Sequence, residues 1–280
     1  MKIKAHAKIN LGLRILNRRS DGFHDLVTIF QRISLADELE IEVLKREIIY
    51  DGPTLTETLE DNICYKAAVF YKTAFGDEAG LRIRLSKHIP TGAGLGGGSS
   101  DAAAVLKVLA ASDGIPIDNT ELQMVAAKLG ADVPFFLSGL PSAIGQGKGE
   151  RISPAKGLDR NCNIVIVKPE ISISTKWAYE QIDNTLTFDK KNINIITHYF
   201  LDYRGGLPTA EMRNDFEAPI FATHPELANA RNRLLDAGAE FSGLCGSGSA
   251  LFGVFQDREL AERVASEWCS PWLSYICRPY

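Results

Sequence analysis

The chain has 280 residues, of which 45% are hydrophobic and 24% are charged, and its formal net charge is −4. This composition is typical of a globular protein with a hydrophobic core, and the length predicts one large domain or two moderate ones. The small negative charge excludes a general basic field for nucleic acid or an anionic membrane, so we expect neither as a partner.

The amino terminus and the cysteines predict a cytoplasmic location. The first eight residues lack the apolar block of a signal peptide, and no apolar run approaches the roughly 20 residues of a transmembrane helix. The five cysteines are scattered, odd in number and without paired metal-ligand spacing. We therefore expect reduced thiols and no metal site built by the protein's own side chains.

The first half of the chain predicts short strands with alternating polarity, followed by helices. The expected strands are residues 1–9, 13–16, 28–33, 38–43 and 81–85. The expected helices are residues 62–74, 101–111 and 122–128, the last ending at Gly130.

The second half mixes both kinds of element. Residues 162–167 and 250–255 are expected strands, and residues 175–182, 193–200, 216–221, 226–236 and 259–268 are expected helices. Because strands and helices do not alternate regularly, the pattern favours an α+β fold. A glycine-rich run at 145–149 interrupts it, so we predict an N-terminal domain of residues 1–150 and a C-terminal domain of residues 151–280.

A glycine-rich loop precedes the helix expected at 101–111. Five of the seven residues 92–98 are glycines, and Ser99, Ser100 and Asp101 follow as N-cap or first-turn candidates. Glycines let the backbone approach a ligand closely, and N–H groups at a helix N-terminus bind anions, most often phosphate. The pattern therefore indicates a phosphate-binding loop rather than a plain helix cap.

Two common nucleotide-binding templates do not fit this loop. A Walker A motif requires a lysine before Ser99, where Gly98 stands. Gly92, Gly94 and Gly97 match the dinucleotide fingerprint formally. The preceding strand, however, alternates apolar and charged residues, whereas the first strand of that fold is usually buried on both faces. We interpret the second match as a coincidence of glycine density.

Residues 90–103 resemble the phosphate-binding motif of the GHMP kinases, which phosphorylate galactose, homoserine, mevalonate and related alcohols. Residues 7–13 and the second glycine-rich segment, 241–252, resemble two further family motifs in the expected order. Residues 19–24 and 129–136 narrow the resemblance within the family. Together with the glycine-rich loop and residues 7–11, they are most similar to family members that act on a cytidine-diphosphate-linked alcohol in the non-mevalonate route to isoprenoids. The resemblance extends from residue 7 to about residue 255.

The resemblance implies a two-domain α+β fold with a strand-rich N-terminal domain, a mixed C-terminal domain, and nucleotide and substrate in the cleft between them. It implies ATP with Mg²⁺, and a monomer or homodimer. The implied ATP-binding residues are Pro90, Gly92, Gly94, Leu95, Gly96, Gly97, Gly98, Ser99 and Ser100, with Asn62 and Lys87 lining the adenine pocket. Ser99 or Ser100 would touch the metal ion.

Two residues are expected to be catalytic. Asp132 stands between Gly130-Ala131 and an apolar run, which suits either an N-cap or a functional acid. Lys8 alone would be interpreted as the solvent face of a half-buried strand. The resemblance instead makes Asp132 the base that accepts the substrate's hydroxyl proton, and places Lys8 against it, where the positive charge keeps the carboxylate ionised.

The expected acceptor site begins at a turn. Phe23 and His24 follow Ser20-Asp21-Gly22. A flat heteroaromatic base could stack on the phenylalanine ring and form hydrogen bonds with the histidine ring. The alternative is that the two residues form a small cluster on the surface. The resemblance implies cytosine as that base. The remaining implied substrate-binding residues are Asn10, Thr175, Tyr179, Gly246 and Ser247, with Trp177 competing with Tyr179 as the second aromatic wall.

Two alternatives stay open at this point. The chain could be another GHMP kinase, acting on homoserine, mevalonate or a sugar, or a nucleotide-binding relative without activity. Phe23 and His24 argue against the first because those substrates carry no base. Lys8 and Asp132 argue against the second because both expected catalytic residues are retained.

Overall fold

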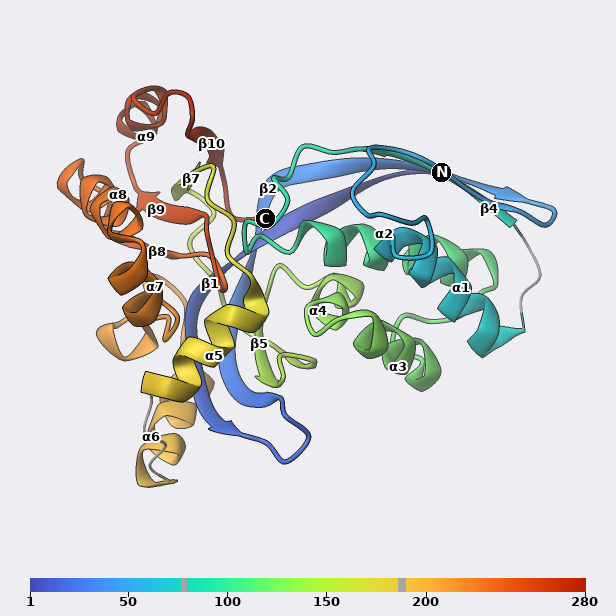
Figure 1. Cartoon of the computed structure of the whole chain (residues 1–280), viewed down its shortest axis with the longest axis horizontal. Helices are drawn as coiled ribbons and strands as arrows, with labels where there is room; N and C mark the ends of the chain where they lie inside the picture. The colour runs from blue at the N-terminus through green and yellow to red at the C-terminus, as the bar shows by residue number, and fades with distance from the viewer. Residues whose placement is uncertain (77–79, 186–189) are drawn as a thin grey trace. The chain divides into compact units, whose positions relative to one another are not determined.

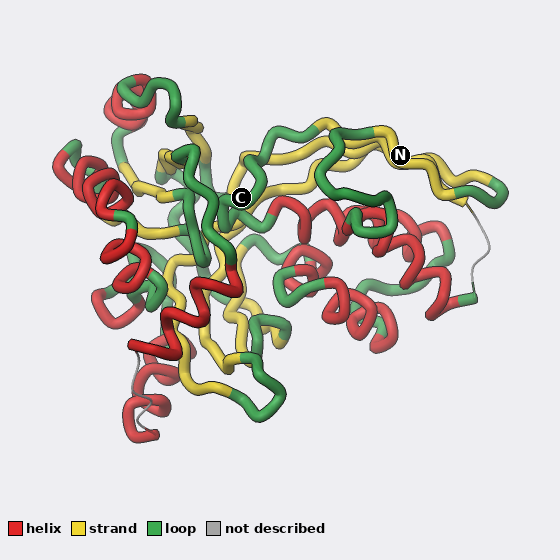
Figure 2. Tube along the Cα trace, in the orientation of Figure 1, coloured by secondary structure: helices red, strands yellow, loops and turns green. Residues whose placement is uncertain are grey.

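The computed structural model describes residues 1–76, 80–185 and 190–280. They form two compact units, each made of separate stretches of chain. Unit 1 comprises Met1–Ala7, Ala36–Thr91 and Gly96–Leu140, and unit 2 comprises Lys8–Leu35, Gly92–Leu95 and Pro141–Tyr280. Both units contain helices and strands (Figure 2), so the α+β prediction is confirmed. The predicted domain boundary at residue 150 stays a prediction.

Unit 1 is a small sheet with helices along one face (Figure 1). The second half of β2 (His24–Leu44) pairs antiparallel with β4 (Gly80–Ser86), which pairs in parallel with β3 (Ile48–Asp51). The helices are α1 (Ile63–Phe75), α2 (Gly97–Ser112), α3 (Thr120–Leu129) and α4 (Val133–Ser138). As the alternation in β4 predicts, Leu81 and Ile83 are buried while Arg84 is exposed.

Helix α2 begins four residues before the expected start at 101. Gly96 is its N-cap with a left-handed φ of 71°, and the N–H of Ser100 donates to the Gly96 carbonyl over 2.9 Å. Ser99 and Ser100 therefore lie inside the first turn, and the prediction that the helix starts at Asp101 was wrong. Low helix propensity argues against Gly97 and Gly98 as helical residues, but a left-handed glycine is a sharp helix boundary wherever it stands.

In unit 2, the glycine-rich run at 145–149 forms part of a β-hairpin. The first half of β2 pairs antiparallel with β5 (Ser142–Gly147), which pairs antiparallel with β6 (Arg151–Pro154). Gly147 and Gly149 take φ values of 72° and 115°, which ordinary residues rarely adopt. The sequence gives no clear signal for these strands because glycine is depleted in strands.

The rest of unit 2 is an antiparallel sheet with helices around it. The strand order is β10 (Leu273–Cys277), β7 (Asn163–Lys168), β9 (Leu251–Phe255) and β8 (Phe241–Leu244). The helices are α5 (Thr175–Thr185), α6 (Lys190–Leu201), the short 3₁₀ helix Ala210–Met212, α7 (Glu217–Thr223), α8 (Pro225–Asp236) and α9 (Arg258–Ser266). No helix in the described residues is long and apolar enough to cross a membrane.

Apolar side chains from strands and helices form the core of unit 2, among them Ile15, Val165, Phe216 and Phe255. The first of these comes from strand β1 (Lys2–Arg18), whose residues belong to both units. The carboxyl-terminal residues supply β10. The Tyr280 N–H also donates to the Arg32 carbonyl over 2.9 Å, so the tail is part of the fold.

A buried ionic cluster lies at the start of α2 in unit 1. The Lys87 amine contacts Asp37 and lies 3.0 Å from Asp101 Oδ2, while Asp37 Oδ1 also accepts from the backbone N–H groups of His88 and Ile89. A Cβ added at Gly97 would lie 2.8 Å from the Lys87 amine. Glycine at the first position of α2 therefore leaves room for this lysine.

Burial, opposed by Lys87 and reinforced by the Asp37 charge, raises the pKa of Asp101 to about 8. Within the described part of the chain, Asp101 Oδ1 is buried without a hydrogen-bond partner. One lysine between two buried carboxylates cannot balance both charges, so Asp101 is the group that holds a proton near neutrality.

We predict that Asp101 makes stability depend on pH in a defined direction. Its pKa is about 8 when folded and about 3.9 in an unfolded chain. The folded protein therefore retains a proton that the unfolded chain has lost, and stability falls as pH rises between these values. Urea unfolding should show the free energy of unfolding of wild type falling, relative to Asp101→Asn, from about pH 4 to about pH 8 and levelling above.

The exposed Asp118 is the matched control. Relative to Asp118→Asn, the wild type should show no such trend. A wild-type free energy that rises relative to Asp101→Asn over this range would contradict the assignment.

Candidate active site

In unit 2, the residues Gly92–Leu95 pack backbone to backbone against the second glycine-rich segment. The Ala250 N–H donates to the Ala93 carbonyl over 3.1 Å, and the Lys8 N–H donates to the Leu95 carbonyl over 3.0 Å. A Cβ on Gly94, whose φ is 75°, would lie 1.8 Å from the Cys245 carbonyl oxygen. The structure thus brings the two glycine motifs together, and contact between backbones requires glycine at 94.

The second segment is held by a buried amide. Asn214 Nδ2 donates to the Leu244 carbonyl over 2.9 Å and to the Gly246 carbonyl over 2.7 Å. Ser247 Oγ lies 3.1 Å from Thr175 Oγ1 at the start of α5. Three of the predicted substrate-binding residues, Thr175, Gly246 and Ser247, are therefore linked in unit 2.

In unit 1, the start of α2 lies beside the loop that carries Asp132. The N–H groups of Gly97, Gly98 and Ser99 precede the first backbone bond of the helix and so have no partner within it. A Cβ added at Gly130 would lie 3.7 Å from Ser99 Oγ, and α2 packs against α4. One unit therefore holds the N–H groups at the start of α2 beside a loop that carries a carboxylate.

Asp132 stands at the N-cap position of α4, as the structural alternative predicts. Its φ and ψ are −83° and −16°, and its side chain makes no capping hydrogen bond. Helix capping therefore does not account for an acid at this position.

Lys8 is buried, with 3% of its surface exposed, so the interpretation as a solvent-facing strand residue was wrong. Ala7 and Ile9 beside it are also buried, which shows that β1 is covered on both faces here. The Lys8 amine donates to Asn10 Oδ1 over 2.8 Å, and Asn10 Nδ2 donates to Thr28 Oγ1 over 2.8 Å. Lys8 belongs to unit 2 and Asp132 to unit 1, so their pairing stays a prediction.

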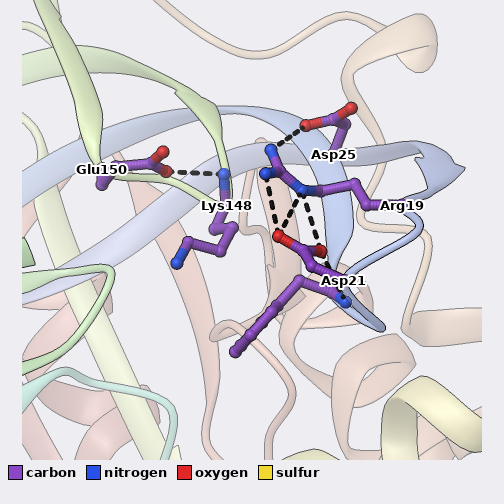
Figure 3. A network of polar contacts seen from close by, with 6 residues as sticks. Arg19, Asp21, Asp25, Lys148 and Glu150 are labelled. Carbon is purple, nitrogen blue, oxygen red and sulfur yellow. Dashed lines mark hydrogen bonds and ion pairs between the residues drawn. The ribbon is translucent and has the colours of Figure 1, made fainter. Parts of the chain in front are cut away.

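The turn before Phe23 is held by charged side chains (Figure 3). The Arg19 guanidinium bonds to Asp21 and Asp25 at 2.9–3.2 Å, and Asp21 Oδ1 accepts from the Phe23 N–H. The hydrogen bonds from Arg19 hold the pKa of Asp21 below its usual range. Phe23 itself is 56% exposed, so this network presents an aromatic ring to solvent.

Lys148 was not predicted from the sequence. It lies in the hairpin of β5 and β6, where its N–H donates to Glu150 over 2.6 Å, and its amine is 4.5 Å from the centroid of the Phe23 ring. A lysine within a glycine-rich run was the only signal. The exposed ring therefore has a cation close to its face.

His24 is buried next to Phe23 and is held on two sides. Its Nε2 lies 2.7 Å from Asp183 Oδ1, and its ring stacks on Tyr179 with centroids 4.7 Å apart and planes inclined by 14°. Trp177 instead lies edge-on to His224. Of the two competing aromatics, Tyr179 is thus the one that contacts the predicted pocket.

Asp183 was also missed. It stands four residues after Tyr179 on α5, so both side chains share one helix face. That spacing was its only signal in the sequence, because the histidine that it contacts is far away in the chain.

The two residues predicted for the adenine pocket both have partners inside unit 1. Asn62 Oδ1 accepts from the N–H groups of Cys64 and Tyr65 and so caps α1, while Lys87 lies between Asp37 and Asp101. Pro90 also belongs to unit 1. Their roles in ATP binding stay predictions.

Two protein-family models match this chain. The model of the GHMP kinases N terminal domain matches residues 62–140, and the model of the GHMP kinases C terminal domain matches residues 206–273. A 4-diphosphocytidyl-2-C-methyl-D-erythritol kinase from Solibacter usitatus is 42% identical over 260 residues, covering 91% of this chain and 81% of the relative.

Two further relatives match almost from end to end. The enzyme of the same name from Porphyromonas gingivalis is 38% identical over 282 residues, covering 99% of this chain and 100% of the relative. A crystal structure of a 4-(cytidine 5'-diphospho)-2C-methyl-D-erythritol kinase superposes with a TM-score of 0.79 at 35% identity, covering 99% of this chain and 98% of that one. The chain therefore belongs to the GHMP kinase family.

Proposed function

We propose that this chain transfers the terminal phosphoryl group of ATP to a hydroxyl group of 4-diphosphocytidyl-2-C-methyl-D-erythritol, in the non-mevalonate isoprenoid pathway. The relatives that match over nearly the whole chain carry the name of this activity. The choice of this acceptor rests on the exposed Phe23 and the buried His24 beside it. Homoserine, mevalonate and sugars have no base that could bind to this pair.

The residues at the start of α2 fit a nucleoside triphosphate. The start of α2 offers backbone N–H groups to an anion, and at Gly98 in its first turn no side chain covers the backbone. ATP supplies the phosphoryl group when bound. Ser99 and Ser100 are the hydroxyl oxygens that the loop offers to Mg²⁺, an ion that prefers oxygen ligands.

Asp132 would accept the proton of the acceptor hydroxyl, since it is an acid beside the start of α2 that serves no capping role. Lys8 would favour the ionised form of Asp132 through its positive charge. Asn10 would orient the hydroxyl, since the hydrogen bond from the Lys8 amine to Asn10 Oδ1 fixes both of these side chains. A cytoplasmic location, and a monomer or homodimer, remain predictions from the sequence.

The activity is tested directly by incubating the purified protein with ATP, Mg²⁺ and one alcohol at a time. We expect ADP formation with 4-diphosphocytidyl-2-C-methyl-D-erythritol and none above background with homoserine, mevalonate or galactose. Equal turnover of any of these three would overturn the choice of acceptor.

The Asp132→Asn variant should bind ATP normally but lose about 10²–10⁴-fold in turnover, the usual contribution of a general base. Lys8→Met should lose a similar factor, and the double variant should be little worse than either, because the two residues act as one unit. Single-turnover kinetics measures the loss. Asp118→Asn, which removes an exposed carboxylate, is the control and should match wild type; a loss below about threefold in Asp132→Asn would refute the assignment.

The Gly94→Ala variant should weaken ATP binding. Both Gly94 and Gly114 have a left-handed φ, of 75° and 67°, so alanine costs each about 1–2 kcal/mol. Only at Gly94 would the added carbon meet a backbone carbonyl, whereas nothing lies within 4 Å at Gly114. The ATP-induced shift in melting temperature should shrink in Gly94→Ala and match wild type in Gly114→Ala. Equal shifts in both variants would place the nucleotide elsewhere.

The Phe23→Ala variant should raise the KM for the acceptor by roughly 5- to 150-fold, the loss expected when a stacking ring worth about 1–3 kcal/mol is removed. The KM for ATP should stay within about twofold. Phe70→Ala removes a partly exposed phenylalanine from α1 and should change neither constant. Equal increases in both constants for Phe23→Ala would show that the base lies elsewhere.

A further inference from the structure

We propose that Asp183 selects cytosine over uracil by fixing which nitrogen of His24 carries the proton. The inference rests on the proposed function, because it concerns the base of that acceptor. Asp183 acts through His24 and is a positioning residue, with no contact to the reacting atoms required.

The geometry allows only one arrangement of a neutral imidazole. His24 Nε2 lies 2.7 Å from Asp183 Oδ1, and the side chains are 4% and 23% exposed. An ionised carboxylate can only accept hydrogen bonds, so Nε2 must be the nitrogen that carries hydrogen. Nδ1 is then left with a lone pair and acts as an acceptor.

The other contacts of the imidazole leave Nδ1 for a ligand. Tyr179 stacks on one face of the ring, and Asp183 holds one end. Within residues 1–76, 80–185 and 190–280, Nδ1 forms no hydrogen bond. Because helix α5 lies beside the start of β2 (Figure 1), a single helix supplies both the ring and the carboxylate that orient His24.

An acceptor at Nδ1 distinguishes the two pyrimidines. Cytosine carries an amino group that donates at its C4 position, whereas the uracil type of base carries an acceptor oxygen there. Cytosine would pair with Nδ1, but uracil would set two acceptors against each other at a buried imidazole. A buried polar site discriminates strongly against an analogue that leaves its groups unpaired.

Arg18 determines how the side-chain amide is oriented in the Asp183→Asn variant. Arg18 Nη1 lies 3.4 Å from Asp183 Oδ2, the oxygen that does not face His24. In Asp183→Asn the guanidinium, which only donates, favours the amide oxygen on its own side and so turns the amide NH₂ toward Nε2. Nε2 must then accept, and the proton moves to Nδ1, which becomes a donor suited to uracil.

The first measurement is the ratio of kcat/KM for the cytidyl and uridyl forms of the acceptor at about pH 8.5, where an ordinary imidazole is neutral. This ratio should fall roughly 5- to 150-fold in Asp183→Asn, the effect of losing one buried hydrogen bond. The KM for ATP should stay unchanged. If Asp183 only anchored α5, both acceptors would suffer equally and the ratio would not move.

The second measurement is the ¹⁵N spectrum of His24 without ligand, assigned by its disappearance in His24→Gln. We expect a proton on Nε2 in wild type and on Nδ1 in Asp183→Asn. Arg18→Gln is the matched control, because it removes the second contact of Asp183 and leaves the bond to His24; both its ratio and its spectrum should match wild type.

The outcomes separate this inference from the proposed function. A wild-type proton on Nδ1, or an unchanged ratio in Asp183→Asn, overturns the role of Asp183 while phosphorylation of the cytidyl acceptor still stands. If wild type phosphorylates neither acceptor, the proposed function fails, and with it the role of Asp183 in choosing a base.

Discussion

The buried amine of Lys8 is the constraint on which much of unit 2 depends. An ammonium group with almost no exposure is tolerated only when it is hydrogen-bonded, and Asn10 and Thr28 supply that chain of contacts. Thr28 in turn donates to the Gly12 carbonyl over 2.6 Å, which ties β2 to β1. A Cβ at Gly246 would lie 3.3 Å from the same amine, so the second glycine segment also leaves space for it.

The Cys245 thiol close to Lys8 is not ionised by the lysine's positive charge. Burial, which outweighs the lowering effect of Lys8, raises the pKa of Cys245 to about 12. Cys245 therefore stays neutral at physiological pH and contributes its carbonyl rather than its sulfur, by forming the surface against which Gly94 packs. The Cys245 thiol therefore adds no negative charge beside the Lys8 amine.

Local patterns in the sequence predicted most of the helices, although not α4, and both glycine segments, but not features that depend on distant contacts. The start of α2 was missed because a left-handed Gly96 outweighs the low helix propensity of Gly97 and Gly98. Lys8 was open to interpretation as exposed because alternation in β1 does not show that both faces are covered. Tyr179 and Trp177 are two residues apart, and only the packing of α5 shows which of them contacts His24.

The same reasoning explains why the supporting residues of the base site were harder to find than the residues expected to touch the base. Phe23 and His24 follow a recognisable turn, whereas Asp183 and Lys148 contact them from segments more than a hundred residues away in the chain. An imidazole alone offers either a donor or an acceptor at Nδ1, so His24 by itself does not specify a base. Specificity requires a second group that chooses between these states, and in unit 2 that group is the carboxylate of Asp183.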